Sequence, residues 1–309
     1  MSAPQQGSQV VEISVVIVTY NSAEVLRACL ESLPAGTAGL SVAEVVVVDN
    51  ASRDGTVDLV RQVDPAAVVI ETGHNAGYAA AINAGLRRCT ARDAVLILNP
   101  DTQLRACCVA PLADVLRQPG AGIAVPRLVG EDGALNHSLR REPSLRTAMG
   151  EAVLGGRRAG RHDGWGEMIT NPRSYERRGT ADWACGAVLL VSRPCLEATG
   201  DWDESFLLYS EETDFCLRAG SAGFATVFEP GSVVEHRGGE CATVPFLWGL
   251  LMANRARLYA ARHGRVRAAA YRAVLALGEA ARVLAGQRRA RAGLRALVRP
   301  STRPTELPS

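Results

Sequence analysis

Polar side chains follow three apolar runs of this chain, each at the point where the run ends. They are Thr19-Tyr20-Asn21 after the first run, Asp49-Asn50 after the second, and Asn99-Pro100-Asp101 after the fourth. Carboxylate oxygens are the ligands that hard divalent cations prefer. Asp101 can therefore supply one ligand to such a cation, whereas the uncharged amide of Asn99 can only position or hydrogen-bond a bound group.

A second acidic cluster, Glu-Glu-Thr-Asp, occupies residues 211–214, where a segment with helical spacing begins. A carboxylate beside a pocket can remove a proton from a hydroxyl group. Acidic side chains are also favoured in the first turn of a helix, because they interact with the helix dipole. The two explanations are compatible, since a helix start beside the pocket is where a base would have to lie.

Alternating strands and helices must position these side chains. Residues 13–19, 45–48, 68–70 and 94–98 form short β-branched runs, typical of strands buried on both faces, and helical spacing lies between them. This alternation predicts an α/β fold with a mostly parallel sheet, in which ligands bind at the carboxyl ends of the strands. A dinucleotide site is disfavoured, because no Gly-x-Gly-x-x-Gly follows the first run.

The remainder of the chain divides into a loop-rich part and a helical end. Residues 130–180 are rich in Gly, Arg and Pro and show little periodicity, which predicts long loops. Residues 245–292 have helical spacing. We expect a main α/β domain over residues 1–240 and a basic helical extension over residues 241–309, whose last few residues are disordered.

Charge is distributed unevenly along the 309 residues, although the formal net charge is only +2. All 34 basic residues are Arg, and residues 255–309 hold 13 of them against Glu279 and Glu306. A coding bias explains the lack of Lys. The cationic, leucine-containing tail can meet an anionic membrane surface or pack on the main domain. Nucleic-acid binding is not expected, because no reader motif accompanies the charge.

The cysteines and the chain start favour a cytoplasmic protein. None of the eight cysteines forms a Cys-x-x-Cys pair, which predicts free thiols in a reducing compartment. Residues 1–9 are polar and lack the apolar core of a secretory signal. The longest apolar run near the tail is too short to cross a bilayer, so membrane contact would be peripheral, on the inner face of the plasma membrane.

Eight motifs follow one another in the order that one known family shows. They are VTYN (18–21), VVDNASRDGT (47–56), HNAGYAAAINAG (74–85), LNPD (98–101), WACGAVLLVSR (183–193), WDESFLLYSEETDFCLR (202–218), VEHRGG (234–239) and NRARLYAARHG (254–264). This series resembles the inverting glycosyltransferases of family 2, which have the GT-A fold, and most of all their bacterial rhamnosyltransferase branch. One motif would be weak evidence, but the ordered series is a strong signal.

The resemblance implies a nucleotide-diphosphate sugar donor. The Asp49 carboxylate can accept the imide N–H of a uracil or thymine base, although Asp-Asn clusters also favour turns. Small residues such as Gly77 let a backbone approach a diphosphate, and close helix packing explains them equally well. The expected donor contacts are Thr19, Tyr20, Asn21, Asp49, Asn50, Asn75, Gly77, Tyr78, Asn83, Asn99 and Asp101.

The resemblance also implies a divalent cation, Mg²⁺ or Mn²⁺, which neutralises charge on the donor diphosphate. The family usually presents Asp-x-Asp where this chain has Asn99-Pro100-Asp101, a variant that is usual in the rhamnosyltransferase branch. His236 matches the family's late metal-binding histidine, and its alternative is a partly buried residue at a strand end. We expect Asp101 and His236 to be the metal ligands.

The resemblance places a catalytic base at the second acidic cluster. The family pattern there is Glu-Asp-x-Asp, whose first Asp removes the proton, and this chain has Glu212 at that position. Its side chain is one methylene longer, so Glu211 is the alternative base. An inverting transfer is a single displacement, for which one base suffices.

Three residues match the family's acceptor-side motif, namely Trp183, Cys185 and Gly186. Trp183 either stacks on a sugar ring or fills the core. Arg140 and Arg141 are candidates for holding an acceptor diphosphate, and a solvated charge pair is the alternative.

The sequence therefore predicts a hexosyltransferase of cell-envelope polysaccharide biosynthesis. It would move a sugar, such as rhamnose from dTDP-rhamnose, to a hydroxyl of a glycan or lipid-linked acceptor. A nucleotidyltransferase is one alternative, but it should show a Gly-rich, Lys-containing loop after the first strand, which this chain lacks. The other is a catalytically inactive sugar-nucleotide or glycan-binding module, which the altered Asn99 and Glu212 favour.

Overall fold

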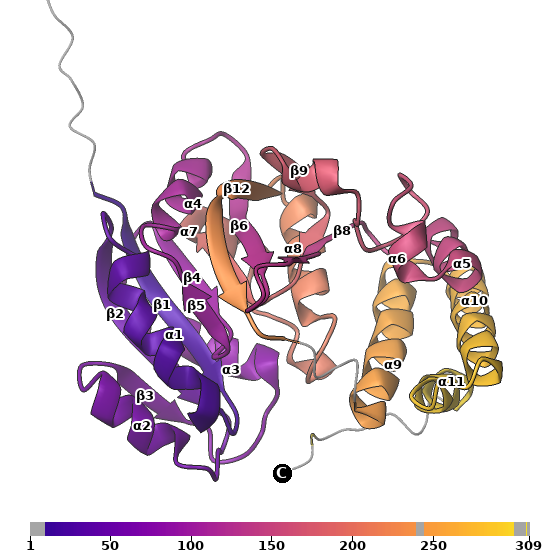
Figure 1. Ribbon diagram of the computed structural model, residues 1–309, viewed down its shortest axis with the longest axis horizontal. Coiled ribbons are helices and arrows are strands. Elements are labelled where there is room, and N and C mark those ends of the chain that lie inside the picture. The colour runs from indigo at the N-terminus through magenta and orange to yellow at the C-terminus, as the bar shows by residue number, and fades with distance from the viewer. Residues whose placement is uncertain (1–9, 239–243, 300–306, 308–309) are drawn as a thin grey trace, which may run out of the picture.

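The structure is a computed structural model that describes residues 10–238, 244–299 and 307. An α/β body lies beside a group of C-terminal helices (Figure 1). The strands are β1 (Glu12–Thr19), β2 (Ser41–Asp49), β3 (Val68–Glu71), β4 (Ala94–Leu98), β5 (Thr102–Leu104), β6 (Ala121–Val129), β7 (Leu135–Asn136), β8 (Leu139–Arg140), β9 (Gly179–Ala181), β10 (Trp183–Ala184), β11 (Val188–Ser192) and β12 (Ala225–His236).

The helices of the body and of the C-terminal group complete the fold. They are α1 (Ala23–Gly36), α2 (Thr56–Val63), α3 (Tyr78–Leu86), α4 (Val109–Leu116), α5 (Leu145–Leu154), α6 (Gly156–Ala159), α7 (Arg193–Thr199), α8 (Glu211–Ser221), α9 (Pro245–Arg262), α10 (Arg265–Leu284) and α11 (Ala290–Val298), with 3₁₀ turns η1 (Pro172–Tyr175) and η2 (Glu204–Phe206).

One large sheet forms the centre of the body, with the order β3-β2-β1-β4-β11-β6-β12-β5 and with β7 and β9 added to β6 and β12. The strands from β3 to β4 are parallel, as are β6 and β12. The predicted mostly parallel sheet flanked by helices is confirmed, and so are the strands predicted at residues 13–19, 45–48, 68–70 and 94–98.

The apolar runs form strands because both faces of the sheet are covered. Val15 and Ile17 of β1 lie in one buried cluster, which includes residues of α1, α2 and α4. Val16 and Val18 lie in a second cluster, which includes residues of α3, α7 and α8. Successive side chains of a strand point to opposite faces, so a run buried on both faces must be apolar throughout.

The antiparallel strand β11 brings the later half of the chain to the carboxyl ends of the first strands. Its first residue, Val188, pairs with Leu98, the last residue of β4. The loop before β11 therefore lies beside the loop after β4, and the Asn99 N–H donates to the Ala187 carbonyl at 2.9 Å. A similar pairing of β12 with β5 places His236 opposite Thr102.

The prediction of long loops over residues 130–180 is wrong for residues 145–154, which form α5. Ser144 caps this helix through a capping box, in which its hydroxyl accepts from the Thr147 N–H at 3.1 Å and the Thr147 hydroxyl accepts from the Ser144 N–H at 3.0 Å. The Gly and Arg residues around it conceal the helical spacing. Its burial depends on a partner distant in sequence, because α5 packs on α10.

The C-terminal helices pack together and against α5 (Figure 1). Arg255 of α9 forms buried ion pairs with Glu151 of α5 and with Glu167. The helical character predicted for residues 245–292 is confirmed. The predicted domain boundary at residue 240 lies among residues 239–243, and the predicted disordered end covers residues 300–306 and 308–309; both lie outside the described residues. Over the described part of the chain, every helix is too short or too polar to span a membrane.

Candidate active site

The loops at the carboxyl ends of the strands bring Tyr78, Asn99 and Gly186 into contact. The Tyr78 hydroxyl donates to Asn99 Oδ1 at 2.8 Å and lies 3.2 Å from the Gly186 carbonyl oxygen. A β-carbon built on Gly186 would lie 3.3 Å from Cβ of Glu212 and 3.7 Å from Cε1 of Tyr78. Four predicted site residues from α3, the β4 end, the β11 loop and α8 therefore meet at one place.

Asp101 and His236 face each other at the ends of β5 and β12. His236 Nε2 lies 3.4 Å from Asp101 Oδ1, and the Gly238 N–H donates to Asp101 Oδ2 at 2.9 Å. Burial alone would raise the pKa of the Asp101 carboxyl, but the hydrogen bond and charge of His236 hold that pKa below its ordinary value. Asp101 is therefore kept ionised, as a metal ligand must be.

Asp101 and His236 are placed so that they could occupy two coordination positions of one divalent cation. Ligand atoms that each lie about 2.1 Å from one cation are roughly 3 Å apart, close to the separation of Nε2 and Oδ1. Among the described residues, no group of three or more His, Cys, Asp or Glu side chains could hold a metal ion by itself. The remaining ligands would have to come from the donor diphosphate and from water, which is common where a metal acts on phosphates.

Glu211 and Glu212 start α8 without a cationic partner in the described structure. Glu211 is 3% exposed, and one carboxylate oxygen of each, Oε2, is buried with no hydrogen-bond partner. Burial raises the pKa of Glu212, and burial together with the charge of Glu212 raises that of Glu211 well above its ordinary value. Only Glu212 lies against Gly186, so it is the acid that faces the predicted acceptor motif. A raised pKa makes a carboxylate a stronger base.

The loops after β1 and β2 are joined around Asp49, which is 2% exposed. Its Oδ1 accepts from the hydroxyls of Thr19 at 2.8 Å and Ser52 at 2.5 Å, and its Oδ2 accepts from the Ser52 N–H at 2.8 Å. Asn21 links the same loops, because its Oδ1 accepts from the Arg53 N–H at 2.9 Å. With these bonds Asp49 stabilises a turn, which was one of its two predicted roles. Its contact with the nucleotide base of a donor stays a prediction.

Gly77 is required where α3 begins. Its φ is +93°, and a β-carbon there would lie 2.4 Å from the Leu207 carbonyl oxygen. Asn50 donates to the Gly77 carbonyl at 3.1 Å, and Asn75 accepts from the Gly77 N–H at 3.3 Å. The predicted donor residues at this loop therefore hold its shape. Whether Asn50, Asn75 and Gly77 also contact the nucleotide stays a prediction.

Asn83 is among the most buried of the predicted donor residues, since it is 1% exposed. Its amide nitrogen donates to the Trp202 carbonyl at 3.0 Å and to Glu204 Oε1 at 2.9 Å, and its oxygen accepts from the Trp202 N–H at 2.9 Å. The side chain is thereby used for packing α3 against the loop that leads to α8.

On the acceptor side, Trp183 is 9% exposed and belongs to the second buried cluster, so most of its ring packs against protein. Its indole N–H donates to the Arg141 carbonyl at 3.0 Å, and the Arg140 guanidinium lies 5.7 Å from its ring centre. Arg141 pairs with Asp163 at 2.9 Å. Arg140 lies close enough to Glu212 for its charge to favour ionisation of that carboxyl.

Two functional features escaped the sequence analysis. Ser52 supplies two of the bonds to Asp49, and only its place two residues after Asn50 could have suggested it. Asn254 is fully buried in α9 and bonds to the loop before Glu211. The available signal was the position of Asn254 directly after the apolar residues 250–253. An amide that is buried with such neighbours needs hydrogen-bond partners.

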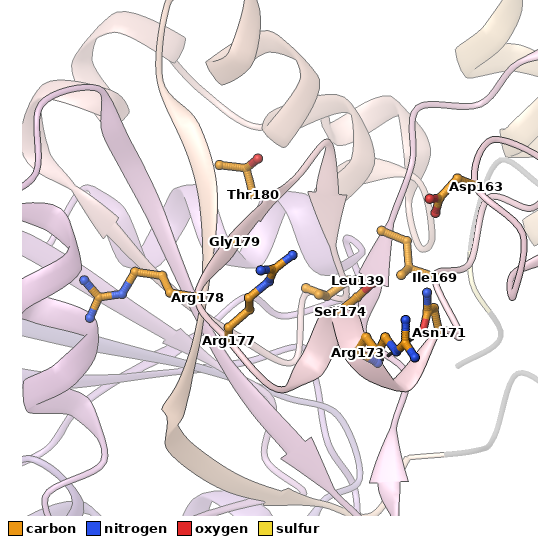
Figure 2. Close-up of a pocket in the computed structure, with 10 residues that line it drawn as sticks. All are labelled: Leu139, Asp163, Ile169, Asn171, Arg173, Ser174, Arg177, Arg178, Gly179 and Thr180. Atoms are coloured by element: carbon orange, nitrogen blue, oxygen red, sulfur yellow. Dashed lines mark hydrogen bonds between the residues drawn. The ribbon is translucent and has the colours of Figure 1, made fainter.

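The structure has one cavity at the predicted metal ligands and another away from the predicted site residues. One of about 130 Å³ is bordered by Asp101 and His236. A larger one of about 310 Å³ is bordered by η1 and the start of β9, and Figure 2 shows its residues. None of the predicted site residues lines the larger cavity. In Figure 2, Arg178 points away from the other side chains. It forms an ion pair with Glu229.

Comparison with known proteins identifies the family to which this chain belongs. The family model "Glycosyl transferase family 2" matches residues 14–175. A protein of Mycobacterium tuberculosis, N-acetylglucosaminyl-diphospho-decaprenol L-rhamnosyltransferase, is 32% identical over 235 residues, which cover 72% of this chain and 75% of that protein. The low-salt glycan biosynthesis hexosyltransferase Agl10 of Haloferax volcanii is 28% identical over 212 residues, 67% of this chain and 61% of that protein.

Solved structures share the fold at lower identity. The mannosyltransferase PcManGT of Pyrobaculum calidifontis, in complex with GDP-Man and Mn²⁺, has a TM-score of 0.55 at 20% identity and covers 95% of this chain and 82% of its own. GalNAc-T7 with UDP, GalNAc and Mn²⁺ has a TM-score of 0.59 at 16% identity over 81% of this chain and 48% of its own. These likenesses show a GT-A fold, and the family match with the 32% identical relative shows that the chain belongs to glycosyl transferase family 2.

Proposed function

We propose that this glycosyltransferase moves a hexose, with inversion, from a nucleotide-diphosphate donor to an acceptor hydroxyl, and that it depends on a divalent metal. One arrangement carries the proposal: Tyr78 contacts both Asn99, two residues before Asp101, and Gly186, which lies against Glu212. Asp101 and Glu212 both lie close enough to Tyr78 for their charges to raise its pKa, so a predicted metal ligand and the predicted base are near the same hydroxyl, which supports a single displacement.

In the proposed reaction, Glu212 accepts the proton of the acceptor hydroxyl. The acceptor oxygen forms a bond to the anomeric carbon while the bond from that carbon to the diphosphate breaks, and the electron pair leaves with the diphosphate. Asp101 and His236 would hold a cation that neutralises the charge on this leaving group. The Tyr78 hydroxyl, whose pKa burial and the nearby charge of Glu211 hold well above its ordinary value, stays a hydrogen-bond donor throughout.

The proposed donor is dTDP-rhamnose, and the proposed acceptor is a lipid-linked or cell-envelope glycan. The Mycobacterium tuberculosis relative supports both, because its name states an L-rhamnosyltransferase and a diphospho-decaprenol acceptor. The Mn²⁺ in the two structural neighbours supports a divalent metal, with Mg²⁺ as the other candidate. The residues named at the ends of β1, β2 and β4 are the proposed donor contacts.

A thermal-shift panel tests the donor site. UDP-, dTDP- and GDP-sugars are each added with Mn²⁺, Mg²⁺ or EDTA, because a ligand that binds only the native state raises the unfolding midpoint. We expect stabilisation by one donor, lost with EDTA and lost in Asp101→Ala at an unchanged ligand-free midpoint. Absence of any shift would contradict the donor site. Binding without any turnover would favour a non-catalytic sugar-nucleotide-binding module.

We also propose that α5 and α10 lie on an anionic membrane surface. Gly278 of α10 packs against Ala152 of α5, so the outer faces of the two helices are neighbours. Val153, Leu277 and Leu284 are 81%, 71% and 90% exposed, and exposed apolar side chains that gather on neighbouring helices favour an interaction site. Met149 and Trp165 extend the exposed apolar area.

The charges of this α5–α10 face fit an anionic lipid surface. The acidic residues of the two helices have partners within the protein. Glu151 pairs with Arg255. Glu279 pairs with Arg282 and accepts a hydrogen bond from the Trp248 indole. Exposed arginines of these two helices and of the adjoining helix α6 remain outside, namely Arg146, Arg157, Arg158, Arg265 and Arg267. Apolar side chains among arginines are the composition of a helix that lies in a membrane interface.

Vesicle sedimentation tests this face. We expect the protein to sediment with vesicles that contain phosphatidylglycerol but not with pure phosphatidylcholine. The double variant Leu277→Glu and Leu284→Glu should lose that binding, whereas Val10→Glu, an exposed apolar residue far from the face in sequence, should keep it. Binding by the double variant as strong as by the wild type would overturn the proposal.

A further inference from the structure

A fully buried amide in the C-terminal helix α9 holds the backbone segment that leads to Glu212. Asn254 is 0% exposed, and its Nδ2 lies within donor distance of three carbonyl oxygens, those of Phe206 at 2.8 Å, Leu208 at 2.9 Å and Tyr209 at 3.0 Å. A carboxamide nitrogen carries two hydrogens, so these carbonyls share the donors available. Few other side chains could satisfy three convergent carbonyls at a fully buried position.

The held segment has an unfavourable backbone conformation. Leu207, Tyr209 and Ser210 have φ values of +63°, +68° and +75°, which side chains other than glycine rarely adopt. Leu207 sits at the centre of a γ-turn, with the Leu208 N–H bonded to the Phe206 carbonyl at 2.8 Å. Such conformations cost free energy and persist only where surrounding contacts impose them.

The segment fixes α8 directly. Ser210 is the residue before the helix, and its carbonyl accepts from the Asp214 N–H at 2.8 Å, the first bond of α8. The Leu207 carbonyl accepts from the Tyr78 N–H at 2.7 Å and contacts Gly77, so the segment also touches the donor loop. A change in these few residues would therefore move Glu212 relative to Tyr78 and Gly186.

A second residue of α9 supports the same contact. Arg257 lies three positions after Asn254, on the same face of the helix. Its guanidinium donates to the Ser205 carbonyl at 2.6 Å and lies 4.9 Å from the ring centre of Phe206. The C-terminal helix therefore reaches the catalytic domain through specific hydrogen bonds as well as through apolar packing.

We propose that Asn254 is a positioning residue for the base, so that the C-terminal helical group is part of the catalytic machinery through one side chain. The inference rests on the proposed role of Glu212 in transfer. Loss of the amide would let residues 205–210 relax, and a displacement of about 1 Å at a reacting group can cost roughly 100-fold in rate. Donor binding should change much less than the rate, because most of the predicted donor contacts lie in the loops after β1, β2 and β4, and the held segment meets the donor side only at Gly77 and Tyr78.

The test compares Asn254→Ala and the isosteric Asn254→Asp with Met252→Ala. Met252 is a buried neighbour in α9 that packs in the C-terminal cluster, so its truncation destabilises that helical group without touching the loop. We expect both Asn254 variants to lose about 100-fold in kcat, with the donor KM changed less than about threefold. We expect Met252→Ala to keep kcat within about threefold of the wild type at a similar loss of Tm.

Two further readouts separate positioning from general destabilisation. Amide hydrogen exchange should rise over residues 205–212 in Asn254→Ala, and the acid limb of its pH–rate profile should move to lower pH as the Glu212 carboxyl becomes hydrated. Wild-type kcat in Asn254→Ala, or an equal loss in Met252→Ala, would overturn the inference. If Asn254→Ala does not fold, Arg257→Ala should show the same pattern with a kcat loss of about tenfold, and wild-type kcat there would count against it.

Failure of the proposed function would be recognised separately. In that case the wild type transfers no sugar at all, and hydrogen exchange alone decides the claim. Unchanged exchange over residues 205–212 in Asn254→Ala would then show that the amide does not hold the segment.

Discussion

The protein has two pairs of acidic side chains in its interior, Glu151 with Glu167 and Glu211 with Glu212. Only the first pair forms ion pairs with an arginine in the described residues. Glu151 and Glu167 both pair with Arg255, which joins α5 to α9. Glu211 and Glu212, at the start of α8, have no ion pair among the described residues, and each leaves one buried oxygen without a partner.

The pKa shifts follow this difference. Burial opposes ionisation of Glu151, yet the charge and hydrogen bond of Arg255 hold its pKa below the ordinary value. The pKa of Glu167 stays raised, because burial outweighs the same Arg255. Burial raises the pKa of both Glu211 and Glu212. The ion pairs of Arg255 thus make one acid pair a structural link, whereas Glu211 and Glu212 form no ion pair in the described residues and feel Arg140 only as a nearby charge, which leaves them able to exchange protons.

The largest expected effect comes from removing the proposed base. Glu212→Gln should reduce transfer by about 10²- to 10⁴-fold, the usual contribution of general acid–base catalysis, while the donor still raises the unfolding midpoint. Glu167→Gln, a change at a buried acid of the other pair, should keep transfer within about threefold of the wild type. An active Glu212→Gln beside an inactive Glu211→Gln would show that the base is Glu211.

The next effect concerns stability rather than rate. Arg255→Met would leave Glu151 and Glu167 buried without their cation, and breaking such a pair costs about 3–5 kcal/mol of unfolding free energy. Urea denaturation measures this loss. Arg27→Met removes an exposed pair with Glu31 and should cost less than about 1 kcal/mol. A loss that small in Arg255→Met would mean that the two pairs do not differ as described.

A pH–rate profile tests whether Glu212 is the acid with the raised pKa. The base must be ionised, so kcat should fall as the pH drops through the raised pKa, and the acid limb should lie above the ordinary pKa of a glutamate. Arg140 favours the ionised form, so Arg140→Gln should move this limb to higher pH. A limb at or below the ordinary glutamate value would contradict the assignment.

The smallest effect concerns Glu211. Its folded-state pKa is raised, so its contribution to stability is present below the unfolded pKa and is lost as the pH rises through the folded one. Glu211→Gln removes this loss, so the variant should gain stability relative to the wild type between pH 5 and pH 8. Thermal unfolding at the two pH values measures it, and a variant that is less stable at pH 8 than the wild type would contradict the prediction.

The β-rich core was predictable because its residues carry the signal themselves. The predicted runs are apolar at almost every position, and β4, which is buried along its whole length, is apolar throughout, as burial on both faces requires. α5 was missed because its stability comes from α10, more than 100 residues away, and the helical spacing of residues 145–154 is interrupted by Gly150 and Arg146. The antiparallel direction of β11 likewise depends on tertiary pairing.

The site was predictable only where residue type decides the chemistry. Asp101 and Glu212 were found as carboxylates in a motif, whereas the packing bonds of Asn83 and the positive φ values at Leu207, Tyr209 and Ser210 leave no trace in residue type. Asn254 illustrates the same limit, because the three carbonyls that it contacts come from a segment about 45 residues earlier in the chain.

The most direct test of the proposed activity is an NMR-monitored transfer reaction with dTDP-rhamnose, Mn²⁺ or Mg²⁺, and a soluble analogue of diphospho-N-acetylglucosaminyl lipid. We expect a product whose new glycosidic bond has the anomeric configuration opposite to that of the donor, formed by the wild type and lost with EDTA and in Glu212→Gln. A product that retains the donor configuration, or undiminished transfer by Glu212→Gln, would contradict the single-displacement mechanism with Glu212 as its base.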